Sequence, residues 1–238
     1  MKPVINSDNL TYFAYTNGHL CRKIREIVLD FHGLGGGNVM ISDDPESAVF
    51  FAQNDALYVL PYYGPWSWMN AHAVRTVDMI VEVCIDKYGL PADIPVISTG
   101  GSMGGLSALA YAHNASRTPT ACAANCPVCD LLFHYTERPD LPRTIWSAFG
   151  WYEGGFEDAM RTASPLHLAA TMPDIPYYIA HCDADLAVNK GSHSDKMVAA
   201  MRAAGRSVVY DEIPGMGHCQ LPPDNLTAYR AWILGFRK

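Results

Sequence analysis

The sequence predicts an α/β fold, a mostly parallel sheet with helices on both faces. Two observations lead to this prediction. Short apolar runs typical of buried strands alternate with segments of helical periodicity. Polar or glycine-rich segments directly follow these strands, as loops do at the carboxyl edge of a parallel sheet. With 238 residues, of which 49% are hydrophobic, the chain is expected to form a single domain over residues 1–238.

The expected strands are short and rich in β-branched and aromatic residues, and the first of them is an edge strand. They cover residues 10–16, 25–31, 56–61, 94–97, 120–125, 176–181 and 207–213. The clearest helix covers residues 71–88, where apolar residues recur at helical spacing and Gly89 and Pro91 follow. Further helices are expected directly after Ser102, over residues 194–204 and over residues 226–236.

Residues 126–174 interrupt the alternation of strands and helices. This stretch contains five prolines and several aromatic residues, among them Trp146 and Trp151. It is too long for a plain loop in a compact domain. We therefore expect a small, mainly helical cap inserted over the carboxyl ends of the strands.

The segment Gly100-x-Ser102-x-Gly104 has the form of a nucleophile elbow. The apolar run before it and the helical spacing of Leu106 and Leu109 after it place Ser102 on a sharp strand-to-helix turn. Glycines on both sides are expected because a side chain there would collide with the neighbouring strand and helix. An ordinary glycine–serine turn is the alternative interpretation.

A glycine-rich loop, His32–Gly37, follows the expected strand 25–31. Phosphate binding is one interpretation, but residues 38–45 do not resemble the helix that such a loop requires, and the lysine of a P-loop is missing. Together with Ser102, the loop is better interpreted as part of an oxyanion hole. The backbone N–H groups of Leu34 and Met103 are the expected donors, and His32 is expected to be structural.

Two further loops carry an acid and a histidine. Asp183 and Asp185 lie in the loop after strand 176–181, and His218 lies in the loop after strand 207–213. Both loops and Ser102 follow strands, so they are expected to meet at one edge of the sheet. The order Ser102, acid, His218 is that of a serine hydrolase with a nucleophile elbow. His218 is expected to act as the base and an aspartate to orient it.

These segments resemble the α/β-hydrolase superfamily over residues 25–236. His181–Val188 is similar to the H-G-x-x-D-x-x-V segment of its prolyl-oligopeptidase-like and carbohydrate-esterase-like branches, and Pro214–His218 to their G-x-x-H end. The resemblance implies that Asp185, rather than Asp183, is the acid. Cys182 and Asn189 depart from the pattern, in which glycine and proline are usual. No propeller domain precedes the hydrolase part of the sequence, so an esterase is expected in preference to a peptidase.

Aromatic residues cluster in the loop after strand 56–61, and these and the aromatics of the expected cap are candidates for one wall of a substrate pocket. The alternative for the loop is that its aromatics pack onto the domain. The candidates are Tyr62, Tyr63, Trp66, Trp68, Trp146 and Trp151. The predicted substrate is a small-molecule ester, such as an acetylated carbohydrate or a feruloyl-type ester. A thioesterase, a small peptidase and a non-catalytic ligand-binding protein of the same fold are the alternatives.

The net charge of −7 argues against nucleic acid and against anionic membrane surfaces as partners. The sequence contains neither the apolar core of a signal peptide nor a stretch long enough to span a membrane. Its seven cysteines lack disulfide-framework spacing, which favours reduced thiols and a cytoplasmic location. Cys126 and Cys129 are interpreted as small buried residues rather than as a redox or metal pair. No metal and no cofactor are expected, and the oligomeric state stays open.

Overall fold

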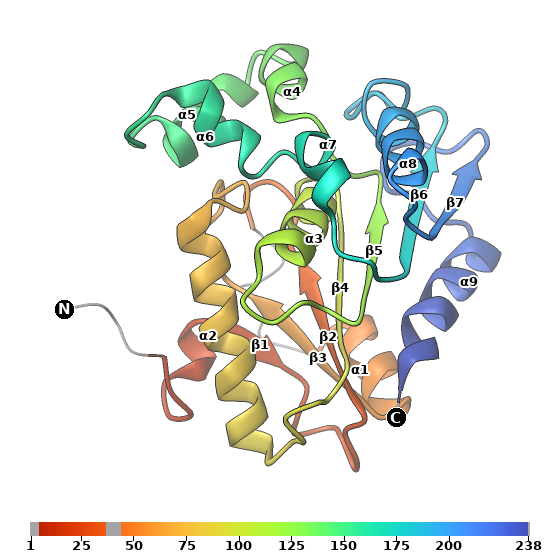
Figure 1. Cartoon of the computed structure of the whole chain (residues 1–238). Coiled ribbons are helices and arrows are strands. Elements are labelled where there is room, and N and C mark those ends of the chain that lie inside the picture. Colours follow the sequence, from red (N-terminus) through yellow and green to blue (C-terminus); the bar gives the residue numbers. More distant parts are fainter. Residues whose placement is uncertain (1–4, 37–43, 238) are drawn as a thin grey trace.

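The computed structural model describes residues 5–36 and 44–237. Its centre is a seven-stranded sheet of order β1-β3-β2-β4-β5-β6-β7 (Figure 1). Edge strand β1 is antiparallel to β3, and the other neighbours are parallel. The strands are β1 (Ala14–Thr16), β2 (Glu26–Phe31), β3 (Ala56–Pro61), β4 (Val96–Gly101), β5 (Ala121–Asn125), β6 (Tyr177–Cys182) and β7 (Val208–Ile213). The predicted α/β-hydrolase fold is confirmed.

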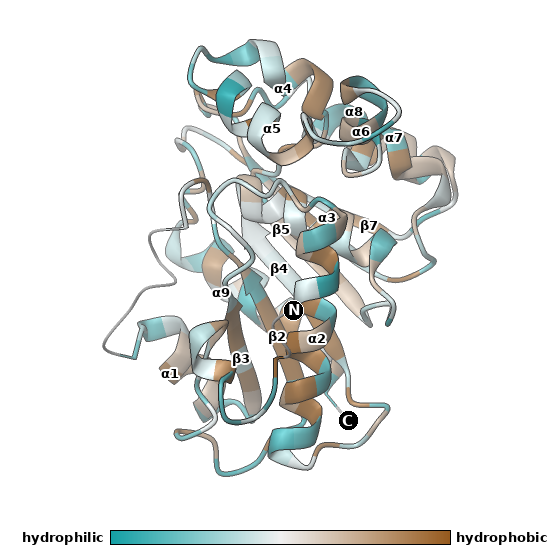
Figure 2. Cartoon of the chain, turned by 90° about the vertical axis from the view of Figure 1, so that its left-hand side faces the viewer, coloured by the Kyte–Doolittle hydropathy of each residue, from teal (hydrophilic) through white to brown (hydrophobic). Residues whose placement is uncertain are grey.

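Helices cover both faces of the sheet and divide the core into two clusters. Buried residues of α2 (Ala71–Tyr88), α3 (Met103–Asn114) and α8 (Ser194–Ala203) pack on one face. Those of α1 (Glu46–Gln53) and α9 (Pro223–Ile233) pack on the other. Successive residues of β2 contribute alternately to the two clusters, as strand geometry requires. The apolar strands β2 and β3 are brown in Figure 2.

The remaining helices are short, and most lie between β5 and β6. They are α4 (Leu131–Glu137), α5 (Leu141–Phe149), α6 (Phe156–Arg161), α7 (Pro165–Leu168) and η3 (Ala169–Thr171), with η1 (Leu10–Tyr12) and η4 (Leu234–Phe236) near the two ends of the chain. In Figure 1, α4, α5 and α6 lie beyond the carboxyl ends of the central strands. This helical segment falls within residues 126–174, the stretch predicted to form a cap.

Local sequence signals explain where the best-defined helix begins and ends. The Asn70 side chain accepts hydrogen bonds from the N–H groups of His72 and Ala73, which caps α2. Gly89 ends the helix with a φ angle of 59°, a left-handed conformation that glycine adopts readily. The predicted bounds of this helix, 71–88, are confirmed. The predicted first strand was partly wrong, because residues 10–12 form η1 and only 14–16 pair with β3.

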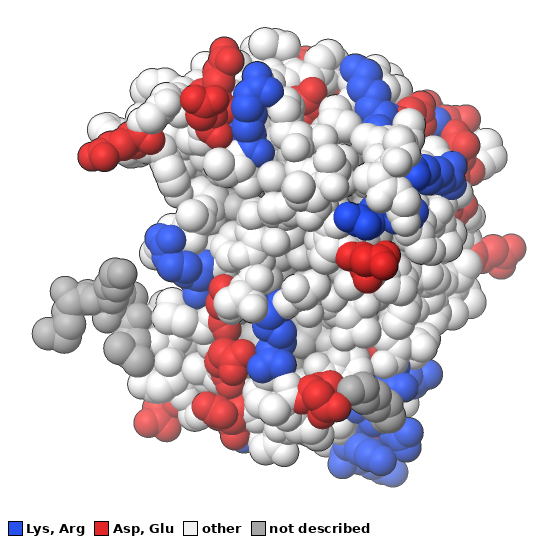
Figure 3. All heavy atoms as spheres, in the orientation of Figure 1, with Lys and Arg blue, Asp and Glu red and all other residues white. Residues whose placement is uncertain are grey.

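Acidic and basic side chains are interspersed over the face shown in Figure 3. Such mixing gives no large surface of one sign on that face. Among the helices of residues 5–36 and 44–237, none combines the length and apolarity needed to cross a membrane.

Candidate active site

Ser102 occupies the turn between β4 and α3, as predicted. Its φ of 60° and ψ of −123° are strained for a residue with a side chain. The two flanking glycines leave no room for a Cβ atom. At Gly104 that atom would lie 2.0 Å from the carbonyl oxygen of Phe31, and at Gly100 it would lie 2.7 Å from backbone atoms of Phe31 and Gly104. The expected reason for glycine on both sides of Ser102 is therefore confirmed.

Asp185 and His218 meet across the ends of β6 and β7. His218 Nδ1 lies 2.6 Å from Asp185 Oδ2, and the Asp185 side chain is fully buried. The other carboxylate oxygen accepts hydrogen bonds from the N–H groups of Ala187 at 2.8 Å and Val188 at 3.0 Å. Asp183 is exposed and instead accepts a bond from the Gly215 N–H. Of the two aspartates, Asp185 is thus the one in contact with His218.

Hydrogen bonds and neighbouring charges determine the pKa values of Asp185 and His218. Burial by itself would raise the pKa of Asp185, but hydrogen bonds from His181, His218 and two backbone N–H groups outweigh it and hold that pKa well below its ordinary value. Burial would lower the pKa of His218, yet its contacts with Asp185 and Cys126 raise it to about 9. Asp185 is therefore ionised, and it stabilises an imidazolium at His218.

Ser102 and His218 line the same pocket, which has a volume of about 560 Å³. Its other walls include Leu34, Trp68 and Arg138. Within the described residues, no hydrogen bond joins Ser102 Oγ to His218, and His218 Nε2 lies 3.7 Å from Cys219 Sγ. A direct hydrogen bond between the two side chains therefore requires a side-chain rotation, and such bonds often form only when substrate is bound.

The glycine-rich loop forms part of the same pocket. Gly33 and Leu34 line it, and the ring of buried His32 contacts the Gly33 carbonyl oxygen at 2.8 Å. Gly35 donates a hydrogen bond to the Pro65 carbonyl oxygen, which fixes the loop to its neighbour. Gly37, the end of the predicted loop, lies outside the described residues. The N–H groups of Leu34 and Met103 stay the predicted oxyanion donors.

Comparisons with known proteins agree with this arrangement. The model of the prolyl oligopeptidase family matches residues 81–236, which include Ser102, Asp185 and His218. The chain belongs to the prolyl oligopeptidase family. No curated protein sequence matches it.

Solved structures of similar fold include both peptidases and esterases. Acylaminoacyl peptidase of Pyrococcus horikoshii is 14% identical with a TM-score of 0.71, over 89% of this chain and 36% of the peptidase. Esterase B of Lactobacillus rhamnosis is 14% identical with a TM-score of 0.68, over 90% of this chain and 76% of the esterase. A puromycin-hydrolysing peptidase of Mycobacterium tuberculosis is 18% identical with a TM-score of 0.67, over 90% of this chain and 35% of the peptidase. The chain thus spans about a third of the length of these two peptidases.

The six predicted pocket aromatics of this prolyl oligopeptidase family member do not lie together. Trp68 lines the pocket of Ser102, but its side chain is only 1% exposed. Its indole N–H donates a hydrogen bond to the buried hydroxyl of Thr144, so the ring points into the core. Tyr62 and Tyr63 line a different pocket, with Phe13 and Met79 among its walls. Trp66, Trp146 and Trp151 are exposed and lie among the lining residues of neither pocket. The six candidates are therefore divided between two pockets and the exposed surface.

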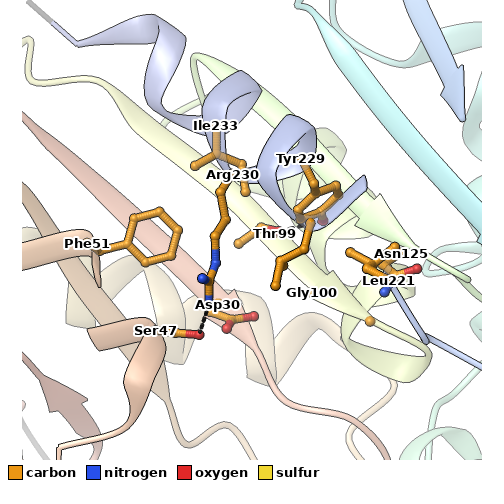
Figure 4. A pocket seen from close by; sticks show the side chains of 12 residues that line it. Asp30, Ser47, Phe51, Thr99, Gly100, Asn125, Leu221, Tyr229, Arg230 and Ile233 are labelled. Carbon is orange, nitrogen blue, oxygen red and sulfur yellow. Dashed lines mark hydrogen bonds between the residues drawn. The ribbon is translucent and has the colours of Figure 1, made fainter. Parts of the chain in front are cut away.

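A smaller recess of about 170 Å³ adjoins the Ser102 pocket, and Figure 4 shows its walls. Asp30 and Gly101 line both spaces, so the two meet at the carboxyl ends of β2 and β4. Asp30 accepts a hydrogen bond from Tyr58, and burial raises the pKa of this carboxyl to about 6. Arg230 of α9 reaches across the recess to Ser47. The recess gives the site a polar side that the sequence analysis did not identify.

Sequence reasoning also missed a cluster of thiols beside His218. Cys126 does not pair with Cys129; its sulfur lies beside His218 and Cys219 instead. A second group of possible metal ligands is formed by His134, Glu137 and His193, in which both histidines contact the same carboxylate oxygen. The position of Cys126 directly after β5 and of Cys219 directly after His218 was the available signal, since both places lie at the site edge of the sheet.

Proposed function

We propose that this chain is a serine hydrolase that cleaves carboxylic esters through an acyl-enzyme. Ser102 is the nucleophile, and His218 takes its proton and then protonates the leaving alcohol. Asp185 keeps the imidazole in the tautomer whose Nε2 can accept that proton. The N–H groups of Leu34 and Met103 stabilise the oxyanion, each such donor contributing about 3 kcal/mol to lowering the barrier.

The contact between Asp185 and His218 carries this proposal. It joins residues 33 positions apart in sequence at 2.6 Å, and His218 lines the pocket that also holds Ser102. A buried aspartate that is held by two backbone donors and contacts the histidine ring is the arrangement that orients a catalytic histidine. The strained backbone of Ser102 supports the same conclusion, because such strain concentrates at functional residues.

The pocket supports a small ester with a polar part as substrate. Its lining combines apolar residues, among them Phe31, Leu34 and Leu141, with the polar residues His134 and Arg138. An acetylated carbohydrate fits this mixture, since hydroxyl groups can bind to the polar side while the acyl group lies near Ser102. A feruloyl-type ester is the other ester class that we propose.

Peptide hydrolysis is a second candidate, and the family match favours it. The family is that of prolyl oligopeptidase, and two of the solved structures cited above are peptidases. The same three residues would cleave an amide if the pocket admits a peptide and His218 protonates the leaving amine.

The test compares the hydrolysis of p-nitrophenyl acetate and butyrate with that of an aminoacyl p-nitroanilide. The wild type is expected to cleave the esters, and Ser102→Ala is expected to lose at least about 10⁴-fold in kcat. Ser116→Ala is the matched control, because Ser116 is exposed and lies outside the pocket. Preferential cleavage of the anilide would select the peptidase, and an active, folded Ser102→Ala would refute the nucleophile.

A further inference from the structure

Three possible metal ligands from two loops meet beside the proposed nucleophile. The sulfurs of Cys126 and Cys219 and a ring nitrogen of His218 all lie within 4.8 Å of one another. Cys126 follows β5, whereas His218 and Cys219 belong to the loop after β7. His218 Nε2 lies 3.7 Å from Cys219 Sγ.

These separations fit a tetrahedral ion of the size of Zn²⁺. With Zn–S near 2.3 Å and Zn–N near 2.0 Å, a tetrahedral site places sulfur and nitrogen about 3.6 Å apart and two sulfurs about 3.8 Å apart. The separation between His218 Nε2 and Cys219 Sγ is already within about 0.1 Å of that value. The two separations that involve Cys126 Sγ are at most 4.8 Å, so they exceed the tetrahedral values by no more than about 1.2 Å, and a movement of that size is enough to bind such an ion.

The surroundings of Cys126 favour the thiolate that a metal requires. Its sulfur accepts hydrogen bonds from the N–H groups of Cys182 at 3.4 Å and Cys219 at 3.3 Å. Backbone donors to a metal-bound sulfur stabilise its charge, as outer partners of metal ligands generally do.

His218 already has the outer partner of a metal-binding histidine. Asp185 accepts a hydrogen bond from Nδ1 at 2.6 Å, so in the neutral imidazole the free electron pair is on Nε2. Cys126 and Cys219 are also held with φ angles of 44° and 58°, an unusual conformation for residues other than glycine. Such strain persists only where the surrounding structure imposes it, and here it aims two sulfurs at one imidazole.

An ion can reach this position from the substrate pocket. His218 and Cys219 both line the pocket that holds Ser102. A fourth ligand, a water molecule or the Ser102 hydroxyl, can complete a tetrahedron from that side. The position thus has an access path as well as a donor set.

We propose that Cys126, His218 and Cys219 form a binding site for a thiophilic divalent cation of the Zn²⁺ class, and that the bound ion reversibly inhibits the hydrolase. The inhibitory part rests on the function proposed above. The electron pair of His218 Nε2 cannot serve a metal and accept the Ser102 proton at the same time. Binding releases to solvent the protons that the two sulfurs and His218 Nε2 carry beforehand, so no oxidant or reductant takes part.

The binding test uses Ser102→Ala, which separates metal binding from hydrolysis. Cd²⁺ is added to the reduced, chelator-treated protein, and the thiolate-to-cadmium charge-transfer absorption is followed in the ultraviolet. One ion per chain is expected, and Zn²⁺ should displace it. Cys126→Ser and Cys219→Ser, each combined with Ser102→Ala, should bind at least about 100-fold more weakly. Cys21→Ser is the matched control, because Cys21 is also half-buried but lies apart from the cluster.

The inhibition test uses the chain with Ser102 intact. Zn²⁺ should stop hydrolysis of p-nitrophenyl acetate, a chelator should restore it, and Cys126→Ser should need at least about 100-fold more Zn²⁺ for the same inhibition. Absence of the charge-transfer band, or a band of equal strength in folded Cys126→Ser and Cys219→Ser, would overturn the metal site. A band in Ser102→Ala together with a wild type that hydrolyses no ester would support the metal site and overturn the proposed function.

Discussion

Replacing Asp185 by asparagine tests the proposed mechanism at its centre. One oxygen of Asp185 accepts two backbone N–H groups, and the other accepts from His218. In Asp185→Asn the two backbone donors select the amide oxygen, so the amide NH₂ group faces His218 Nδ1. The imidazole then carries its proton on Nε2 and cannot accept one from Ser102. Loss of the correct tautomer costs about 10⁴-fold in kcat, or about 5 kcal/mol of barrier.

The assay measures kcat and KM for p-nitrophenyl acetate, with circular dichroism to verify the fold. Asp183→Asn is the matched control, since Asp183 is exposed and contacts only the Gly215 N–H through its side chain among the described hydrogen bonds. We expect this control to stay within about twofold of wild type. An Asp185→Asn variant that keeps more than a tenth of the activity, or an equal loss in Asp183→Asn, would refute the assignment of the acid.

Three further changes test the structure around the site. Gly104→Ala should lower the free energy of unfolding, measured in urea, by at least about 3 kcal/mol, because its Cβ would lie 2.0 Å from the Phe31 carbonyl oxygen. A smaller loss would contradict the close approach of α3 to β2 at this turn. Burial raises the pKa of Glu26 from 4.5 to about 7, so the folded state binds the extra proton and stability falls as pH rises between these values. Glu26→Gln should therefore gain about 2 to 3 kcal/mol relative to wild type between pH 5 and pH 8 in urea titrations. Equal differences at both pH values would refute this. Tyr62→Ala should keep kcat/KM for p-nitrophenyl acetate within about twofold of wild type, since Tyr62 lines another pocket; a tenfold loss would place it in the substrate path.

Local rules predicted the parts of the fold in which neighbouring residues decide the structure. The bounds of α2 follow from the apolar stripe, the Asn70 cap and the left-handed Gly89. The elbow follows from two glycines and the strand before them, and the choice of Asp185 over Asp183 came from the family resemblance alone. Helix α1 was not predicted, because its sequence has no capping side chain and no strong apolar periodicity.

Features that depend on packing between distant segments were not predictable in the same way. The aromatic residues at 62–68 are close in sequence, but the turn sends Trp68 into the core towards Thr144 and Tyr62 to another pocket. Cys126 and Cys219 are 93 residues apart, and their meeting depends on the places of β5 and β7 in the sheet. A sequence pattern identifies which loops share an edge of the sheet, but not which side chains touch there.

The position of His218 connects the proposed reaction with the proposed metal site. Asp185 fixes one ring nitrogen of His218, so the other nitrogen is the only atom that can serve either Ser102 or an ion. In this structure that nitrogen lies next to Cys219 Sγ, and among the described residues it forms no hydrogen bond with Ser102. Catalysis requires it to turn towards the serine, and binding of an ion holds it near the thiols. The same hydrogen bond from His218 Nδ1 to Asp185 that prepares His218 as a base therefore also prepares it as a metal ligand.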